Sequence, residues 1–147
     1  LDLCEYIQHS WEALGFNVEV NINPPSTHRE QVSKSQLSIF RGSWIADYAD
    51  AENYLTLFYS YNHSPNGPNY THFSNSEFDD LYQKSLCIPE LANRISYYQM
   101  MDSIIINQAA IIPLYYDNVL RFTHKSVVGL GSNSMNQLDL KRVKIIN

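Results

Sequence analysis

Residues 16–41 read FNVEVNINPPSTHREQVSKSQLSIFR, and this stretch decides the fold class. Apolar and polar side chains alternate over residues 16–22, which is typical of a strand with one buried face. The pattern Thr27-x-x-Glu30 is a capping box and predicts a short polar helix that runs to about residue 35. Residues 37–41 predict a second strand. A strand, a short helix and a strand form a compact βαβ unit, so the two strands are expected to be parallel neighbours.

Helical patterns flank this unit on both sides. Apolar residues recur at helical spacing over residues 3–14, and Gly15 is a natural C-terminal cap. Further on, we expect a helix over residues 52–59, a helix opened by the capping box Ser74-x-x-Glu77 and continuing to Leu86, and a helix with Pro89 in its first turn. In this last helix one stripe contains Leu91, Ile95, Tyr98, Asp102 and Ile105.

The C-terminal part is rich in strand-forming residues. Residues 111–116 and 119–123 flank Asp117-Asn118 and predict a hairpin, and residues 127–130 and 138–146 predict further strands. The expected fold class is therefore α/β, with a mixed sheet, flanking helices and at least one parallel pair, in a single domain over residues 1–147.

Composition narrows the function classes. The chain has 147 residues, 44% of them hydrophobic, which suits one globular domain with its own core. A formal net charge of -5 without a basic cluster argues against nucleic acid as a partner. The longest apolar runs are too short to span a bilayer. Cys4 and Cys87 fit as small core residues better than as a disulfide. Since the chain starts at Leu1 within a helical pattern, we expect it to be a piece of a longer protein.

Residues 44–50, WIADYAD, place a tryptophan and two carboxylates just beyond the end of the second predicted strand. Ligands of open α/β sheets usually bind beyond the carboxyl ends of the strands. Asp47 is therefore the first candidate for a ligand contact, and the alternative is a carboxylate that caps a helix or a turn. Trp44 is either a flat pocket wall or a core residue. Asp50 is expected to be structural, holding the turn or capping the next helix.

Residues 44–50 resemble the W-x-x-D-Y-x-D signature of the oligopeptide- and dipeptide-binding proteins of ABC importers, family 5 of the extracellular solute-binding proteins. Three further matches follow in the expected order: Asn69-Tyr70 with residues 73–81 (FSNSEFDDL), residues 94–98 (RISYY) and residues 110–116 (AIIPLYY). The resemblance covers nearly the whole chain. Ala51 and Ala110 replace two prolines common in the family, and both changes affect backbone stiffness rather than ligand chemistry.

The resemblance implies a fold of two α/β lobes joined by a hinge, the type II periplasmic-binding-protein fold, with the ligand enclosed between the lobes. This chain would be part of the C-terminal lobe. The family's pattern implies that Asp47 contacts the peptide amine and that Trp44 lines the cleft. In some relatives an arginine placed like Arg41 pairs with the peptide carboxylate, while an exposed arginine is the plain alternative. Asn66 and Asn69 could contact the peptide backbone, although turn formation explains loop asparagines at least as well.

The expected function is that of the substrate-binding component of a bacterial ABC importer, which delivers peptides to permease subunits of the membrane. The resemblance implies a periplasmic or extracytoplasmic location, an N-terminal lipid or membrane anchor, and a monomer. We expect no cofactor, no metal and no enzymatic activity, since the five histidines lack metal-ligand spacing and no nucleophile or phosphate motif is present. Two alternatives stay open: a non-peptide ligand such as a nickel chelate, haem or a sugar, and a carboxylate-dependent hydrolase using Asp47 and Asp50.

Overall fold

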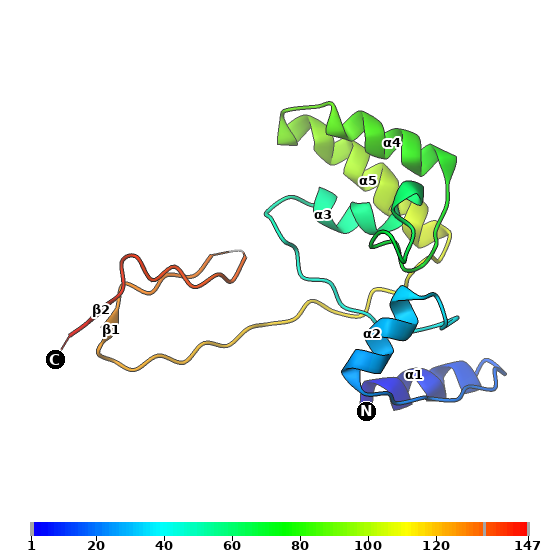
Figure 1. Ribbon diagram of the computed structural model, residues 1–147, viewed down its shortest axis with the longest axis horizontal. Helices are drawn as coiled ribbons and strands as arrows, with labels where there is room; N and C mark the ends of the chain where they lie inside the picture. The colour runs from blue at the N-terminus through cyan, green and yellow to red at the C-terminus, as the bar shows by residue number, and fades with distance from the viewer. Residues whose placement is uncertain (1, 134, 147) are drawn as a thin grey trace.

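The computed structural model describes residues 2–133 and 135–146. Figure 1 shows a helical body and a long extended arm that carries the C-terminus. The elements of the body are α1 (Asp2–Glu12), α2 (Pro25–Ser33), α3 (Glu52–Leu55), the 3-10 turns η1 (Thr56–Phe58) and η2 (Ser60–Asn62), α4 (Ser76–Leu86) and α5 (Leu91–Asn107). The arm contains the short strands β1 (Val127–Val128) and β2 (Lys144–Ile145).

The hydrophobic core lies between α3, η1, α4 and α5. Phe78 of α4 and Met101 of α5 are fully buried against each other's helices. The rings of Phe58, Phe73 and Phe78 meet edge to face, with centroids between 5.7 and 6.5 Å apart. This geometry suits the ring quadrupoles. We call α3, η1, α4 and α5 the core module. One aromatic cluster holds this module together and fixes the position of α3.

The helix α4 begins where an asparagine caps it. The Asn75 side chain accepts a 2.9 Å hydrogen bond from the backbone N–H of Phe78. Glu77 and Asp79 lie in the first turn, where negative charge favours the helix dipole. The helix was expected here, but its cap was placed one residue too early, at Ser74.

The start of α5 and its buried stripe also differ from the expectation. Glu90 is the N-cap of α5, so Pro89 precedes the helix instead of lying in its first turn. Tyr98 and Ile105 of the expected stripe are buried with Met101, whereas Leu91, Ile95 and Asp102 are exposed. The buried residues of α5 are Tyr98, Met101 and Ile105, which join the aromatic core.

The first two helices lie below this module in Figure 1. The helix α1 was expected at this place, and Gly15 follows it with a positive φ of 93°, as a C-terminal glycine should. The helix α2 starts earlier than expected, at Pro25, with Pro24 as N-cap and no side-chain cap. The predicted capping box at Thr27 and Glu30 is therefore wrong, because the proline in the first turn already starts the helix.

The predicted strands are mostly not formed in the part of the chain that the structure describes. Residues 16–22, 37–41, 111–116 and 119–123 pair with no neighbour, so the parallel pair and the hairpin are wrong for these residues. The predicted strands 127–130 and 138–146 shrink to β1 and β2, which pair antiparallel with Val127 opposite Ile145. Alternating side chains predict a half-buried surface, but a strand also needs a partner edge to fill its hydrogen bonds. The architecture is helix-rich, with one small antiparallel sheet.

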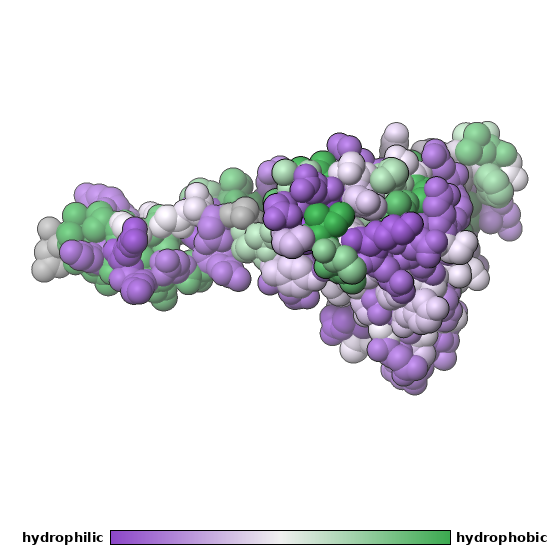
Figure 2. All heavy atoms as spheres, turned by 90° about the horizontal axis from the view of Figure 1, so that it is seen from above, coloured by the Kyte–Doolittle hydropathy of each residue, from purple (hydrophilic) through white to green (hydrophobic). Residues whose placement is uncertain are grey.

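Many apolar side chains of these segments are exposed. Phe16, Ile22 and Ile39 are each more than 60% exposed, and in the arm Tyr116 and Phe122 exceed 90%. Figure 2 shows apolar residues spread over the surface of the arm as well as the body.

Cys87 is also exposed, contrary to the expected core position, because it follows the end of α4. Cys4 is half-buried, and both cysteines are free thiols. In residues 2–133 and 135–146, no helix combines the length and the apolar character that a membrane crossing requires.

Candidate ligand-binding site

Three of the residues expected to bind a ligand, Arg41, Trp44 and Asp47, lie on the connection that leads from the α2 side of the body to α3 (Figure 1). We call residues 44–50 the motif segment. It is held from its inner side by Asn53 of α3, whose side chain is 3% exposed. The Oδ1 atom of Asn53 accepts hydrogen bonds from the indole Nε1 of Trp44 at 2.8 Å and from the backbone N–H of Asp47 at 3.1 Å. The half-buried Trp44 and the exposed Asp47 are thus fixed by the same atom.

Asp50 ties the motif segment to α5. Its Oδ1 accepts the backbone N–H of Glu52 at 3.0 Å and the hydroxyl of Tyr98 at 2.9 Å, and its Oδ2 lies 2.8 Å from Nη1 of Arg94. Burial alone would raise the pKa of Asp50, but the Glu52 N–H, the Tyr98 hydroxyl and the Arg94 guanidinium outweigh it and hold this pKa below its usual value. Asp50 therefore stays ionised and has the structural role expected of it.

A second carboxylate holds two tyrosines beside the motif segment. Glu52 accepts hydrogen bonds from the hydroxyls of Tyr48 and Tyr82. Burial and the bond to Glu52 raise the pKa of Tyr82 well above its usual value. The pKa of Tyr48 is raised as well, first by its bond to Glu52 and then by burial. Both hydroxyls remain protonated at neutral pH and act as donors, so Glu52 links the motif segment to α4.

Asp47 differs from its two acidic neighbours. Its side chain is exposed, and in the described part of the chain its carboxylate takes part in no ion pair and no side-chain hydrogen bond. Asp50 and Glu52 have their acceptor atoms filled by the protein. The motif segment therefore presents one free carboxylate to solvent on a backbone that is held in place. Such a group can bind a cation or a hydrogen-bond donor.

Arg41 lies just before the motif segment and is exposed. Its Nη2 donates a 2.8 Å hydrogen bond to the hydroxyl of Tyr115, and its backbone carbonyl lies 2.9 Å from Nε2 of His28. The contact with Tyr115 joins the start of the arm to the motif segment. The guanidinium carries five N–H donors, so further donors remain for a ligand.

The two loop asparagines behave differently. Asn66 is exposed at the tip of the loop that follows η2. Asn69 is fully buried, its Nδ2 donating to the carbonyls of Tyr59 and Phe73 and its Oδ1 accepting from Thr71 and from the N–H of Phe73. All four hydrogen-bonding positions of its amide are filled. The turn explanation therefore holds for Asn69, and a ligand contact through its side chain is ruled out by this geometry.

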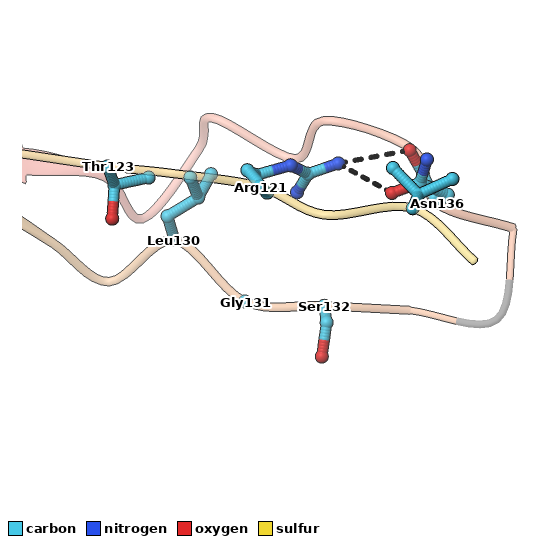
Figure 3. A pocket seen from close by; sticks show the side chains of 7 residues that line it. Arg121, Thr123, Leu130, Gly131, Ser132 and Asn136 are labelled. Atoms are coloured by element: carbon cyan, nitrogen blue, oxygen red, sulfur yellow. Dashed lines mark hydrogen bonds between the residues drawn. The ribbon is translucent and has the colours of Figure 1, made fainter.

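Two hollows of the described surface lie in the arm, away from the motif segment. The first, of about 250 Å³, is formed between extended parts of the arm and is lined by Val119, Arg121, Thr123, Leu130, Gly131, Ser132 and Asn136. In Figure 3 the guanidinium of Arg121 is already bound to the backbone and side-chain oxygens of Asn136. Arg121 is the one charged side chain among the residues that line this hollow. Among the described residues no group of three His, Cys, Asp or Glu side chains is placed to hold a metal ion.

The motif segment lies within the region that matches a known protein family. A model of the bacterial extracellular solute-binding proteins, family 5 (middle region), matches residues 1–66. Similar proteins align with most of the chain, beyond the part that the family model matches. The predicted resemblance to family 5 of the bacterial extracellular solute-binding proteins is thus confirmed.

Three relatives illustrate the range of ligands named among the proteins that this chain resembles. It is 28% identical to the probable D,D-dipeptide-binding periplasmic protein of Escherichia coli strain K12, over 87% of this chain and 25% of that protein. It is 26% identical to a dipeptide-binding protein of Bacillus subtilis strain 168, over 95% of this chain and 25% of that protein. It is 28% identical to a probable deoxycholate-binding periplasmic protein of Escherichia coli strain K12, over 79% of this chain and 21% of that protein. The chain thus spans about a quarter of the length of these relatives.

The residues that contact the motif segment and hold it in place were not predicted from the sequence. Asn53, Glu52 and Arg94 contact the motif segment, yet they lie outside it in the sequence. One signal was available for Asn53, because asparagine is a poor helix former and its presence inside a predicted helix points to a side-chain task. Arg94 begins residues 94–98, which resemble the family, but this likeness does not indicate its partner Asp50. No comparable signal marks Glu52, since glutamate is common on helix surfaces.

Proposed function

We propose that this chain is part of the substrate-binding component of an ABC importer, and that it binds short peptides by their N-terminal amine. The observation that carries the proposal is the free carboxylate of Asp47 on a motif segment held by Asn53 and Asp50. The two dipeptide-binding relatives support peptide as the ligand class. These relatives are binding proteins, which supports a transport role rather than catalysis.

The chemistry of a peptide explains why one exposed carboxylate is useful. Every unmodified peptide carries an ammonium group at its N-terminus, whatever its side chains are. A receptor that accepts many sequences should therefore bind the ends and the backbone. A charge-assisted hydrogen bond between Asp47 and this ammonium contributes about 1.5–3 kcal/mol. The contribution is largest when a second lobe closes over the site and excludes water.

Three further residues have supporting roles in this proposal. Trp44 offers the exposed part of its ring as a wall that buries area without selecting a side chain. Arg41 keeps guanidinium donors free beside its bond to Tyr115, and a bidentate guanidinium suits the C-terminal carboxylate of a peptide. Asn66 is exposed and offers both a donor and an acceptor to the peptide backbone. Asn69 has no place in the site, since its amide is fully used by the loop.

In the whole protein, residues 1–147 would form part of the C-terminal lobe of a type II periplasmic-binding-protein fold. Two lobes close around the ligand, and the closed form docks on the permease subunits, which lets the transporter distinguish loaded from empty receptor. The exposed apolar faces of residues 16–22 and 37–41 support this placement, because they resemble strand faces that other parts of a longer chain could cover. The proposal places the receptor outside the cytoplasm, as a monomer with an N-terminal membrane anchor.

The test is calorimetry on the full-length protein with a tripeptide in two forms, one with a free amine and one N-acetylated. The variant Asp47→Asn removes the charge while keeping the size of the side chain. Asp80→Asn is the matched control, since Asp80 is an exposed carboxylate on α4. We expect Asp47→Asn to weaken binding of the free-amine peptide by roughly 10- to 100-fold, and Asp80→Asn to change it less than about twofold. Equal binding of both peptide forms by all three proteins would contradict the proposal.

A second candidate is a non-peptide ligand, which the deoxycholate-binding relative favours. A bile acid carries a carboxylate and no ammonium, so Asp47 would repel it or point into water. In that case Asp47→Asn would leave binding unchanged or strengthen it. Mass spectrometry of the small molecules retained by native full-length protein separates the two candidates, because it reads the ligand directly.

A further inference from the structure

One buried amide, that of Asn53, holds both Trp44 and Asp47 of the motif segment. We infer that Asn53 is a positioning residue for peptide binding, which sets the directions of Trp44 and Asp47 through a single oxygen atom. This inference rests on the proposed function and deepens it, since it names what makes the site specific for an amine at one fixed place. It concerns a residue outside the W-x-x-D-Y-x-D pattern.

The geometry that carries the inference joins two groups of different kind. Oδ1 of Asn53 receives a side-chain donor, the indole N–H of Trp44 at 2.8 Å, and a backbone donor, the N–H of Asp47 at 3.1 Å. An amide oxygen has two lone pairs, so both donors are satisfied and no acceptor capacity is left over. Because the donors come from opposite ends of the four-residue stretch 44–47, the oxygen fixes the shape of that stretch.

Asn53 is itself held firmly. Its backbone N–H donates to the carbonyl of Asp50 at 3.1 Å, and its side chain is 3% exposed at the start of α3. The next residues of α3 and η1 bury Leu55 and Phe58 in the aromatic core. The position of the Asn53 oxygen is therefore set by the core and by Asp50, which is itself anchored to α5 by Arg94 and Tyr98. A positioning group must be more rigid than the group it positions.

Other residue types at this place would fail for different reasons. Alanine leaves two buried or half-buried N–H donors without an acceptor. Aspartate keeps an acceptor but adds a charge close to Asp50 and Glu52, two carboxylates that already share this corner. Glutamine is one methylene longer and would displace the turn. The small neutral amide is thus matched to its two donors.

The experiment uses the full-length protein and the free-amine tripeptide, with Asn53→Ala compared with Asn69→Ala. Asn69 is the matched control because it is an equally buried amide that holds a different loop. Both variants are expected to melt at lower temperatures. At a temperature where both are folded, we expect Asn53→Ala to weaken peptide binding at least tenfold, and Asn69→Ala to weaken it less than threefold. Equal losses in the two variants, or no loss in Asn53→Ala, would overturn the inference.

A spectroscopic readout tests the geometry without any ligand. In protein labelled with 15N-tryptophan, the indole N–H signal of Trp44 is assigned by its absence in Trp44→Phe. We expect this signal to move upfield and to exchange faster with water in Asn53→Ala, but not in Asn69→Ala. An unchanged signal in Asn53→Ala would overturn the hydrogen bond itself and with it the inference.

The outcome for Asp47→Asn separates this inference from the proposed function. If Asp47→Asn loses peptide binding and Asn53→Ala does not, the positioning role is wrong and the peptide site stands. If Asp47→Asn binds peptide as well as the unmodified protein, the proposed function is wrong, and the positioning role falls with it even if the indole signal moves.

Discussion

Nη1 of Arg94 on α5 lies 2.8 Å from Oδ2 of Asp50 in the motif segment. Each of the two side chains is 19% exposed, and the hydroxyl of Tyr98 donates to the other oxygen of Asp50 at 2.9 Å. Two stretches that resemble the same family, residues 44–50 and 94–98, thus meet in space. The ion pair joins the exposed segment proposed to bind peptide to a helix of the core.

Removal of Arg94 should destabilise this junction. In Arg94→Met the carboxylate of Asp50 loses its cation while remaining mostly buried, and we expect the free energy of unfolding to fall by about 2 kcal/mol. The loss is moderated because Nε of Arg94 is buried without an acceptor among the described residues. Urea denaturation measures the change. The control is Arg121→Met, since Arg121 is exposed in the arm; an equal effect of both variants would contradict the prediction.

The same pair predicts how stability depends on acid. The pKa of Asp50 is lower in the folded chain than its ordinary value of 3.8, so the folded state binds this proton less readily than the unfolded state. The stability contributed by the carboxylate is therefore complete above about pH 4 and is lost as the pH falls through the folded pKa. Melting temperatures between about pH 5 and 2 test this, with Asp50→Asn as comparison. The melting temperature of Asp50→Asn should depend less on pH than that of the unmodified protein. An equal dependence in both proteins would contradict the prediction.

The aromatic core should respond sharply to a cavity between α4 and α5. Met101 is fully buried, whereas its neighbour Met100 is 44% exposed on the same helix. We expect Met101→Ala to lower the free energy of unfolding by about 3 kcal/mol and Met100→Ala by less than about 0.5 kcal/mol. Denaturant titration of the two variants gives the comparison directly. Similar values would mean that the helix faces are assigned wrongly.

Gly67 should not tolerate a side chain. A Cβ atom at this position would lie 2.4 Å from the backbone oxygen of Asn62, which itself accepts the N–H of Asn69 at 2.8 Å. Gly67→Ala must therefore shift the loop, at a cost of about 1–3 kcal/mol. Gly42→Ala is the control, because its new Cβ would meet only the ring of Phe40 at 3.6 Å. Melting temperature and limited proteolysis of the loop report the difference, and equal resistance to protease would argue against it.

The 147-residue chain by itself should bind peptide poorly. The proposed site encloses its ligand between two lobes, and one face of a cleft buries too little of the ligand and leaves Asp47 in water. We expect binding of the free-amine tripeptide to be at least ~100-fold weaker than in the full-length protein. Calorimetry on both proteins measures this. Tight binding by the 147-residue chain would show that one lobe suffices.

The helices could be predicted because their hydrogen bonds are local. Apolar spacing and capping residues place α1, α4 and α5 to within a few residues, since each helical turn closes with residues four positions away. The errors lie at the ends, where Asn75 instead of Ser74 caps α4 and Glu90 instead of a residue before Pro89 caps α5. At those positions several residues can serve as caps, and packing selects one.

The strands could not be predicted with the same success. Residues 16–22 have the alternation of a strand and residues 37–41 are expected to form a second one, but a ladder requires a neighbouring edge that these residues do not find in the described part of the chain. The alternation predicts an extended backbone with an apolar face. It does not contain the identity of the partner, because pairing joins segments that are remote in sequence.

The sequence by itself determined the resemblance to family 5, the place of the motif segment and the helices of the aromatic core. Only the tertiary structure decided which acidic group is free. In the folded chain Asp50 is bonded to Arg94 and Tyr98, and Glu52 accepts hydrogen bonds from two tyrosines. Asp47 stays exposed, with its backbone N–H bonded to the oxygen of Asn53. The physical reason is that a carboxylate's availability depends on donors brought to it from distant helices, and their approach is set by the packing of the core.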